Sequence, residues 1–410
     1  MALDWQPKNI GVVFKISERC NIACTYCYFF FGGDESYKGH PVVVPVDVTH
    51  GLTRFVREGI DDYGIESVSV ILHGGEPMMM KPQRFDEMCQ TLRDGLEAHC
   101  RLRFGMQTNA MLVNDKWVDL FEKHQVGVGV SMDGPKAIND EARLDHQGRG
   151  TYDRVVRGLR QLQDAASKRR ISPVGALCVV DPRRDGGEIY RHFVDELGIR
   201  FLNFLPLDLH HGNVTPEVVD GTLEYMVKVF QEWTRDNQAD IRIRFFSELV
   251  SAFLSDNSMG HIGAARSEIH QLMTVSSDGT LGAEDDIRTL HPRFADVGLN
   301  VKTASMRELF STPQWREMAD CVHTPPPGCS ECEWWRVCRG GHAPHRYDEA
   351  NGLNNPSIYC DALKEVYTEV ASYLISHGLK LDDLMRRLTG TLEEGEPAPR
   401  QPEAPEVTFA

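Results

Sequence analysis

Two hydrophobic patterns alternate along roughly the first 240 residues of the chain. Short apolar runs rich in β-branched residues lie near 10–16, 67–73, 101–107, 126–132, 174–180 and 201–207. Amphipathic stretches of helical spacing lie near 47–62, 83–98, 114–124, 151–168, 186–197 and 216–234. Strands that alternate with such helices form βα units around a parallel sheet. The pattern therefore predicts an α/β fold with six βα units, a partial (β/α)6 TIM-like barrel that six strands leave partly open.

After Asp240 the rhythm changes. The segment "IRIRFFSELVSAFL" predicts a strand and a helix, and irregular segments rich in Gly, Pro and Cys then run to Cys360. The segment "ALKEVYTEVASYLISHG" predicts a last helix, and the tail "EEGEPAPRQPEAPE" has the composition of a disordered segment. We therefore expect a barrel domain (1–240), a bridging segment (241–269), a small Cys-rich domain (270–365), a C-terminal helix (366–390) and a disordered acidic, Pro-rich tail (391–410).

Composition and charge limit the partners and the cellular location that we expect for the protein. The 410 residues are 41% hydrophobic and 25% charged, with a formal net charge of −16. These values are ordinary for a globular protein, and the negative charge argues against a nucleic-acid partner. No apolar run approaches the roughly 20 residues that span a bilayer, and "MALDWQPKNI" does not resemble an export signal. We expect a cytoplasmic protein without a membrane partner.

The eleven cysteines form two groups. Three lie in "CNIACTYC" (20–27) and five lie between 321 and 360, whereas Cys89, Cys100 and Cys178 stand singly and are expected to be small buried apolar residues. Because the cytosol keeps thiols reduced, clustered cysteines there indicate metal or redox chemistry instead of disulfides.

The first group has the spacing C-x₃-C-x₂-C, formed by Cys20, Cys24 and Cys27. Three thiolates can hold a [4Fe–4S] cluster and leave one iron open, as a catalytic site requires. The alternative is a structural zinc site with its fourth ligand elsewhere. The segment resembles the C-x₃-C-x-Φ-C signature of radical S-adenosylmethionine (SAM) enzymes, with Tyr26 at the aromatic position. The resemblance covers roughly residues 8–240 and implies reductive cleavage of SAM to a 5′-deoxyadenosyl radical.

Further segments match SAM-binding motifs of this family. "LHGGEP" resembles the GGE motif, which implies that Gly74, Gly75 and Glu76 meet the SAM amino group; an ordinary strand-to-helix turn is the alternative. Ser131, in "VGVSMDGP", is implied to meet the ribose or carboxylate of SAM, and Arg143 to pair with that carboxylate. Asp133 and Arg143 could instead form a loop ion pair. Gln107 and Asn109 end the third strand, where such folds carry their ligands.

The second cysteine group consists of Cys329, Cys332, Cys338 and Cys360. Four thiolates can complete one [4Fe–4S] cluster or a zinc site, and the spacing does not choose between them. The region 270–365 resembles the SPASM iron–sulfur domain of radical SAM enzymes that modify peptides, which implies one auxiliary [4Fe–4S] cluster. Trp334 and Trp335 could pack over it, meet a peptide or belong to the core.

The chain departs from the complete SPASM pattern. That pattern has a further cysteine where this chain has His342, and an upstream one where it has Glu284. The resemblance implies that these thiols would hold the first auxiliary cluster, so we expect that cluster to be missing, whereas the four retained cysteines match the ligands of the second. Cys321 lies outside the pattern. In resembling enzymes an acidic residue follows the upstream cysteine, which implies that Asp285 is a catalytic base. Glu284 and Asp286 compete for that role, and a solvated acidic turn is the alternative.

The segment "GGHAPHRYDEANGLNNPSIYC" resembles a subgroup that forms cyclophane crosslinks in ribosomally made peptides. The resemblance implies a precursor peptide with a leader, a reducing partner such as flavodoxin or ferredoxin, and a β-hydrogen abstraction. The first strand begins within about ten residues of the N-terminus, so we expect leader recognition by the chain itself or by a separate leader-binding protein. The alternatives are a thioether-forming maturase, a sulfatase formylglycine maturase, and a non-catalytic iron–sulfur electron carrier or sensor.

Overall fold

The computed structural model describes residues 7–256, 258–259 and 271–390, and these divide into two compact units. The first unit contains residues 7–176 and 271–317, and the second contains residues 177–256, 258–259 and 318–390. Most of the predicted bridging segment is described, but residues 257 and 260–269 and the predicted tail (391–410) lie outside the described residues. The predicted domain boundaries stay predictions.

The strands of the first unit form a mostly parallel sheet in the order β11-β10-β1-β3-β4-β5. Their bounds are β1 Asn9–Ser17, β3 Ser67–Gly74, β4 Arg101–Thr108, β5 Val126–Ser131, β10 Leu272–Val275 and β11 Leu281–Gly282. β1 is buried over eight of its nine residues, because it pairs with a neighbour on either side. β11 is antiparallel to β10 and ends the sheet.

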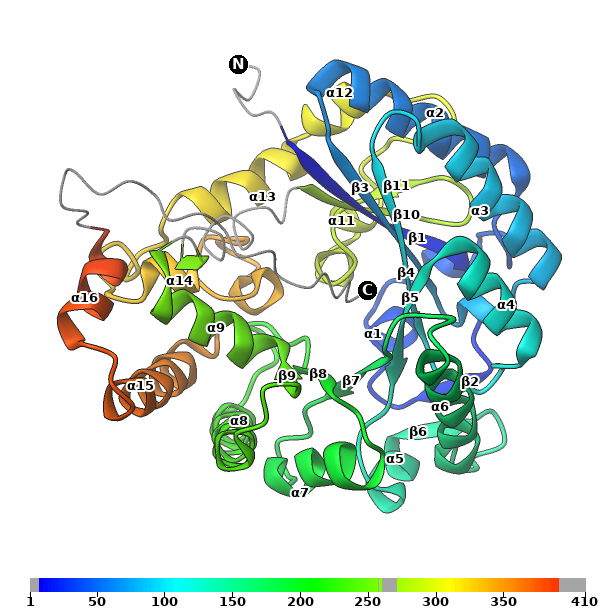
Figure 1. The fold of residues 1–410 in the computed structure, drawn as a ribbon. Helices are drawn as coiled ribbons and strands as arrows, with labels where there is room; N and C mark the ends of the chain where they lie inside the picture. The colour runs from blue at the N-terminus through cyan, green and yellow to red at the C-terminus, as the bar shows by residue number, and fades with distance from the viewer. Residues whose placement is uncertain (1–6, 257, 260–270, 391–410) are drawn as a thin grey trace. The chain divides into compact units, whose positions relative to one another are not determined.

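Helices follow the strands as the periodicity predicts. In the first unit they are α1 Tyr28–Phe31, α2 Val46–Tyr63, α3 Pro82–Leu96, α4 Asp115–His124, α5 Lys136–Ala142, α6 Tyr152–Ser167, α11 Pro292–Ala295 and α12 Met306–Phe310. The helices α2, α3 and α4 lie along one side of the strands (Figure 1). Each helix buries an apolar face, which in α2 includes Leu52 and Phe55. Gly64 caps the C-terminal end of α2 with a φ of 65°, a left-handed conformation that suits glycine.

A small second sheet contains Cys24, the middle cysteine of the first group. β2 (Ile22–Cys24) pairs antiparallel with β6 (Arg143–Asp145), so that Cys24 lies opposite Arg143. The strands β2, β6, β10 and β11 were not expected from the sequence pattern. A strand of two to four residues is too short to show a period of its own.

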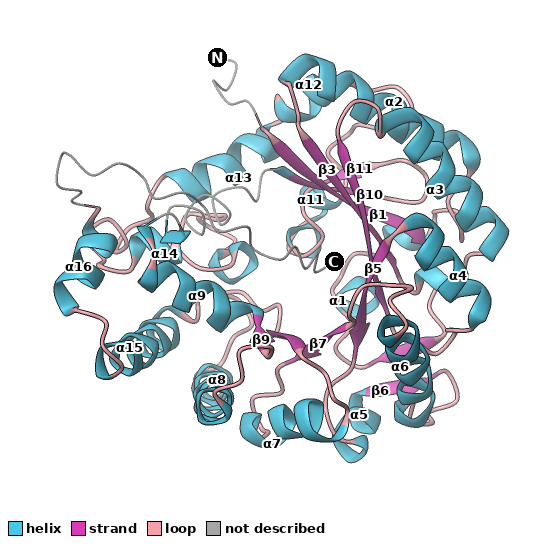
Figure 2. Cartoon of the chain, in the orientation of Figure 1, coloured by secondary structure: helices cyan, strands magenta, loops and turns pink. Residues whose placement is uncertain are grey.

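The second unit is mainly helical (Figure 2). Its strands are β8 Phe201–Leu205 and β9 Arg242–Ile243, which pair in parallel, with β7 (Gly175–Val179) next to β8. Its helices are α7 Gly186–Arg191, α8 Pro216–Asp236, α9 Arg244–Leu254, α14 Trp335–Cys338, α15 Cys360–Ser376 and α16 Leu381–Thr389, with a π-helical turn at His192–Glu196. α13 (Pro313–His323) crosses the boundary between the units. α15 packs against α8 and α9.

The main expectation for the fold is confirmed. All six predicted strands and the helix of each βα unit are present at their expected positions, and so are β9, α9 and α15. The predicted C-terminal helix is divided into α15 and α16. No helix among the described residues is long and apolar enough to cross a membrane.

Candidate active site

The loop after β1 gathers the first three cysteines. Cys24 ends β2, and Cys27 is the residue before α1. Burial raises the pKa of Cys20 to about 12, and the neighbouring thiols Cys24 and Cys27 add to the shift. The structure therefore brings these three thiols together, and all three are free of disulfides.

The GGE segment runs directly beside this loop. The amide of Gly75 donates to the Ser17 carbonyl at 2.8 Å, and the amide of Glu76 donates to the Arg19 carbonyl at 2.9 Å. Gly74 has a φ of 131°, and a Cβ there would lie 2.0 Å from the Ser17 oxygen. Only glycine fits this close approach of two backbones, so the backbone geometry by itself explains why residue 74 is a glycine.

Glu76 is almost fully buried and its carboxylate has three donors. They are the amide of Met78 at 3.0 Å, the hydroxyl of Thr108 at 2.7 Å and the amide of Asn109 at 2.8 Å. Burial raises the pKa of Glu76 while these hydrogen bonds oppose the rise. A carboxylate offers about four lone-pair sites, so one remains for a ligand. Glu76 therefore ties the end of β4 to the GGE turn and can still accept from an ammonium group.

Tyr26, Asp133 and Arg143 form a buried chain of hydrogen bonds. Arg143 Nη1 donates to the Tyr26 hydroxyl at 2.6 Å, and that hydroxyl donates to Asp133 Oδ2 at 2.5 Å. Arg143 Nη1 and Asp133 Oδ1 lie 4.0 Å apart, which is the loop ion pair that the sequence left open. Arg143 Nε is nevertheless buried without a hydrogen-bond partner in the described part of the chain. The guanidinium thus has a donor left for an anion.

The ends of β4 and β5 add polar groups. Gln107 Nε2 donates to the Ser131 hydroxyl at 2.7 Å, and Gln107 Oε1 is buried with no partner among the described residues. Asn109 Nδ2 donates to Asn21 Oδ1 at 2.7 Å, inside the cysteine loop. The structure therefore brings Gln107, Ser131 and Asn109 to the edge where parallel strands carry ligands.

Asp285 follows β11, and the sheet places it beside β1. The Lys15 ammonium and the Tyr28 hydroxyl both donate to its Oδ2. Lys15 also donates to Nδ1 of His73, at 3.0 Å, and that nitrogen lies 3.5 Å from Asp285 Oδ2. Tyr28 directly follows Cys27, so Asp285 contacts the residue next to the cysteine group.

The other oxygen of Asp285 is not in a hydrogen bond. Oδ1 is buried without a hydrogen-bond partner in the described residues, and Arg288 Nη1 lies 4.0 Å from it. Burial alone would raise the pKa of Asp285, but the positive charges of Lys15 and Arg288 outweigh it and hold this pKa well below its usual range. His73 adds little charge at neutral pH, because burial lowers its pKa to about 4. Asp285 is therefore an ionised carboxylate with one unused acceptor.

Four residues of this site were not expected from the sequence, namely Lys15, Tyr28, His73 and Arg288. A charged residue inside the apolar run "IGVVFKI" was an available signal for Lys15, because a fully buried lysine requires a partner. Nothing in the sequence pointed to Arg288. Glu284, the alternative base, is half-buried, whereas the hydrogen bonds from Lys15 and Tyr28 go to Asp285.

In the second unit, the four later cysteines line one pocket. Cys329, Cys332, Cys338 and Cys360 share it with Trp334, Trp335, Lys364 and Tyr367. Burial raises the pKa of Cys329 to about 11, and the other three thiols contribute. Trp334 is buried against Tyr367, with ring centroids 5.5 Å apart, and Phe253, which agrees with a role in the core.

The remaining cysteines stay apart from both groups. Cys89 and Cys178 are buried as predicted, whereas Cys100 is only half-buried. Cys321 is buried and is not part of a disulfide. His342 does not join the pocket of the four cysteines but lies next to Asp208 and His345.

The residues present fit the cofactors that the sequence implies. Three thiols in one loop and four in one pocket are the donor sets for a cluster with an open iron and for a fully ligated cluster. Near the first set, Arg143 Nε and Gln107 Oε1 are a buried donor and a buried acceptor without partners in the described chain. A bound molecule with carboxylate, amino and hydroxyl groups such as SAM would satisfy atoms of this kind.

The chain is similar to a known protein family and to several known proteins. Residues 14–192 match the model of the radical SAM superfamily. The chain is 26% identical over 372 residues to the cysteine-type anaerobic sulfatase-maturating enzyme of Clostridium perfringens (strain 13 / Type A), covering 88% of this chain and 95% of the relative.

Solved structures share the fold. The structure of native anSMEcpe with bound AdoMet superposes with a TM-score of 0.74 at 24% identity, covering 90% of this chain and 98% of that one. Streptococcus suis SuiB bound to the precursor peptide SuiA gives a TM-score of 0.50 at 15% identity, covering 87% and 76%. At these identities the likeness shows the fold, and it confirms the predicted TIM-like α/β class. Together with the matching domain model, it identifies the chain as a radical SAM enzyme, with its radical SAM domain at residues 14–192, that uses a [4Fe–4S] cluster and S-adenosylmethionine.

Proposed function

We propose that this enzyme is a peptide maturase that removes a hydrogen atom from a β-carbon of a ribosomally made peptide and joins that carbon to an aromatic side chain. The observation that carries the proposal is Asp285. Its Oδ1 is a buried, ionised acceptor without a partner in the described chain, and its Oδ2 is held by the residue that follows Cys27. A crosslink of this kind must lose a proton, and Asp285 is the group suited to take it.

Three groups of residues would hold the cofactors. Cys20, Cys24 and Cys27 would ligate the SAM-binding cluster, and the four pocket cysteines would ligate one auxiliary cluster. Tyr26, Gly74, Gly75, Glu76, Ser131 and Arg143 would surround SAM, Glu76 through its remaining lone-pair site and Arg143 through Nε. When bound, the cluster and SAM supply a 5′-deoxyadenosyl radical. The protein's part is to orient the substrate and to exclude water.

The proposed reaction needs one electron acceptor besides the radical, and in our proposal an oxidised iron–sulfur cluster held by the four pocket cysteines takes that electron. The substrate gives one hydrogen atom to the radical, and its β-carbon bonds to the ring. The ring then gives up one electron and one proton and becomes aromatic again. The proton is acidic after the electron has left, so a carboxylate of low pKa is a sufficient base. In our proposal Oδ1 of Asp285 accepts it, while Lys15 and Tyr28 keep Oδ2 in place.

A second candidate is formylglycine formation in a sulfatase. The match to a cysteine-type anaerobic sulfatase-maturating enzyme over 88% of this chain favours it. That reaction also removes a β-hydrogen and needs a base, so the same site would serve. Two features favour the crosslink over formylglycine. The chain has Glu284 and His342 at positions where the complete SPASM pattern has cysteines.

The product distinguishes the two candidates. The reconstituted enzyme is incubated with SAM, a reductant such as flavodoxin, and either a β-deuterated precursor peptide encoded near its gene or a sulfatase peptide. A crosslink appears as the loss of two hydrogens, with no fragmentation between the joined residues and deuterium in 5′-deoxyadenosine. Formylglycine instead reacts with a hydrazide. If 5′-deoxyadenosine forms but neither peptide is changed, both candidates are wrong and the enzyme acts on another substrate.

A further inference from the structure

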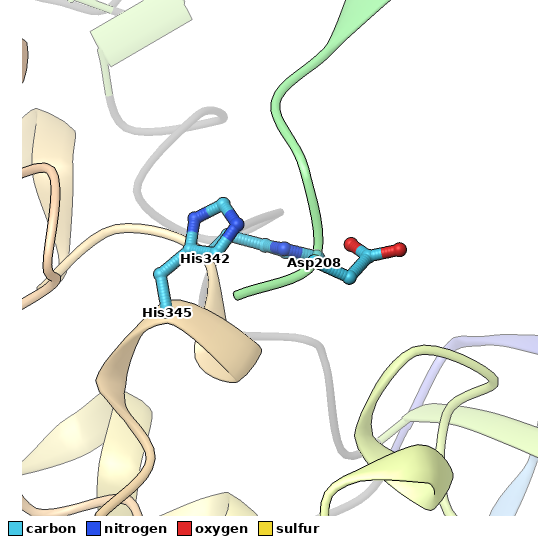
Figure 3. Close-up of side chains that lie close together, drawn as sticks. All are labelled: Asp208, His342 and His345. Atoms are coloured by element: carbon cyan, nitrogen blue, oxygen red, sulfur yellow. The ribbon is translucent and has the colours of Figure 1, made fainter. Parts of the chain in front are cut away.

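A second group of metal-ligating side chains lies in the second unit, apart from the cysteines. Asp208, His342 and His345 each offer a ligand atom, and these atoms lie within 4.8 Å of one another. Both histidines come from one turn, and Asp208 comes from the segment after β8 (Figure 3). His342 is exposed, Asp208 is half-buried and His345 is buried. We propose that these three residues bind a single divalent transition-metal ion of the Zn²⁺ or Fe²⁺ class.

The local backbone explains why the two imidazoles meet. His342 precedes the 3₁₀ turn Ala343–Arg346, and the amide of His345 donates to the His342 carbonyl at 3.1 Å. Side chains three residues apart on a 3₁₀ turn lie one above the other. The ring centroids of the two histidines are accordingly 5.1 Å apart. The turn therefore presents two nitrogen ligands on the same side.

His345 has the contacts of a metal-binding histidine. Its Nε2 lies 3.1 Å from the Leu207 carbonyl, which can only accept, so Nε2 carries the hydrogen and Nδ1 keeps its lone pair. Metal-binding histidines commonly donate their other N–H to a backbone carbonyl. The Tyr359 ring packs edge-on at 4.8 Å and fixes the imidazole plane.

The Leu207 carbonyl connects the turn that carries the two histidines with the segment that carries Asp208. It holds His345, and the next residue along the chain is Asp208, whose carboxylate completes the ligand set. Two imidazoles and one carboxylate form the set found in catalytic zinc sites and in non-haem Fe(II) sites. Three protein ligands leave at least one coordination position for water or a substrate group. The site is therefore of the open kind, with the exposed His342 toward solvent.

His342 supports the same assignment from the sequence. It occupies the position at which the complete SPASM pattern has a cysteine. Replacing a thiolate with an imidazole changes the preferred metal but keeps a transition-metal ligand. The four pocket cysteines do not include His342, so the proposed ion is separate from the auxiliary cluster.

Zn²⁺ is the probe, because it is redox-inert and adds nothing to the iron count. The holoenzyme, with its clusters reconstituted under anaerobic conditions, is titrated with Zn²⁺ and examined by zinc X-ray absorption. We expect one Zn²⁺ per chain with nitrogen and oxygen ligands. His342→Ala and Asp208→Asn should each weaken binding by about 100-fold or more. His377→Ala, an exposed histidine at the end of α15, is the matched control and should bind as the wild type does.

The two variants avoid the buried His345, and iron and sulfide contents show that each has kept its clusters. Zinc bound through sulfur would place the ion at cluster cysteines and overturn the proposal. Unchanged affinity in both variants would overturn it as well. If His342→Ala instead loses four irons and four sulfides, the residue ligates a cluster, and the single-ion site is wrong.

Discussion

The Lys15 ammonium donates to the carboxylate of Asp285, a residue 270 positions away along the chain. Lys15 is fully buried in β1, and the side chain of Asp285 is 7% exposed. The parallel pairing of β10 with β1 brings these residues together. This contact keeps Asp285 ionised inside the protein. It uses only Oδ2, so Oδ1, which has no hydrogen-bond partner among the described residues, can accept a proton from a substrate.

Removing the ammonium should destabilise the protein. Lys15→Met removes the ammonium that pairs with the buried Asp285 carboxylate, and breaking a buried pair costs about 3–5 kcal/mol. The thermal unfolding temperature of the reconstituted protein should fall, and adding Asp285→Asn should recover part of the loss. Lys8→Met, which breaks the exposed pair with Glu66, is the control and should change stability by less than about 1 kcal/mol. An equal effect of Lys8→Met and Lys15→Met would contradict this account.

Asp285→Asn should separate the two halves of the reaction. The amide keeps the shape of the side chain but cannot take up a proton, so 5′-deoxyadenosine should still form while modified peptide falls by roughly 100-fold or more. Both are measured by chromatography and mass spectrometry in the same sample. Asp286→Asn is the control at the neighbouring acidic residue and should leave the product unchanged. Wild-type amounts of product from Asp285→Asn would end the assignment of the base.

His73 should contribute a pH dependence to stability. Its pKa of about 4 in the folded protein lies below the ordinary value of 6.5, so the unfolded chain binds more protons between these values. Stability should therefore decline as the pH falls from about 6.5 to 4. In His73→Asn this decline should be smaller, as seen in the difference between the two unfolding temperatures at each pH. Parallel pH curves for the two proteins would show that His73 does not titrate in this way.

Glu76→Gln should weaken the binding of SAM. The amide can still accept from Met78 or Asn109, but it no longer offers charge to an ammonium group, a loss of about 1–3 kcal/mol. Equilibrium binding of SAM to the reconstituted protein measures it, with circular dichroism to show that the turn has kept its fold. Unchanged affinity would leave Glu76 with its structural role alone.

The number of clusters follows from the two cysteine groups. Three and four thiolates can hold two [4Fe–4S] clusters, about eight irons per chain. Cys360→Ala should remove about half of the iron and sulfide. Changing Cys20, Cys24 and Cys27 to Ala should abolish SAM cleavage but keep the absorbance of the auxiliary cluster. About twelve sulfides per chain would instead reveal a third cluster and contradict this count.

The sequence by itself determined the framework. The alternation of apolar runs with amphipathic stretches located six strands and their helices, because strand and helix periods are local properties of the chain. The spacing of the cysteines likewise predicted two groups. Cys20, Cys24 and Cys27 lie within eight residues, so any compact loop brings them close, and the later four do meet in one pocket.

Only the tertiary structure decided which distant side chains meet. β10 has four residues and no periodicity of its own, and its position beside β1 depends on long-range pairing that local pattern does not encode. That pairing sets Asp285 against Lys15, and the Leu207 carbonyl similarly holds His345 next to Asp208. A buried charge or a neutral imidazole is stable only where the fold supplies its partner. The chemistry of both places therefore depends on contacts between residues far apart in the sequence.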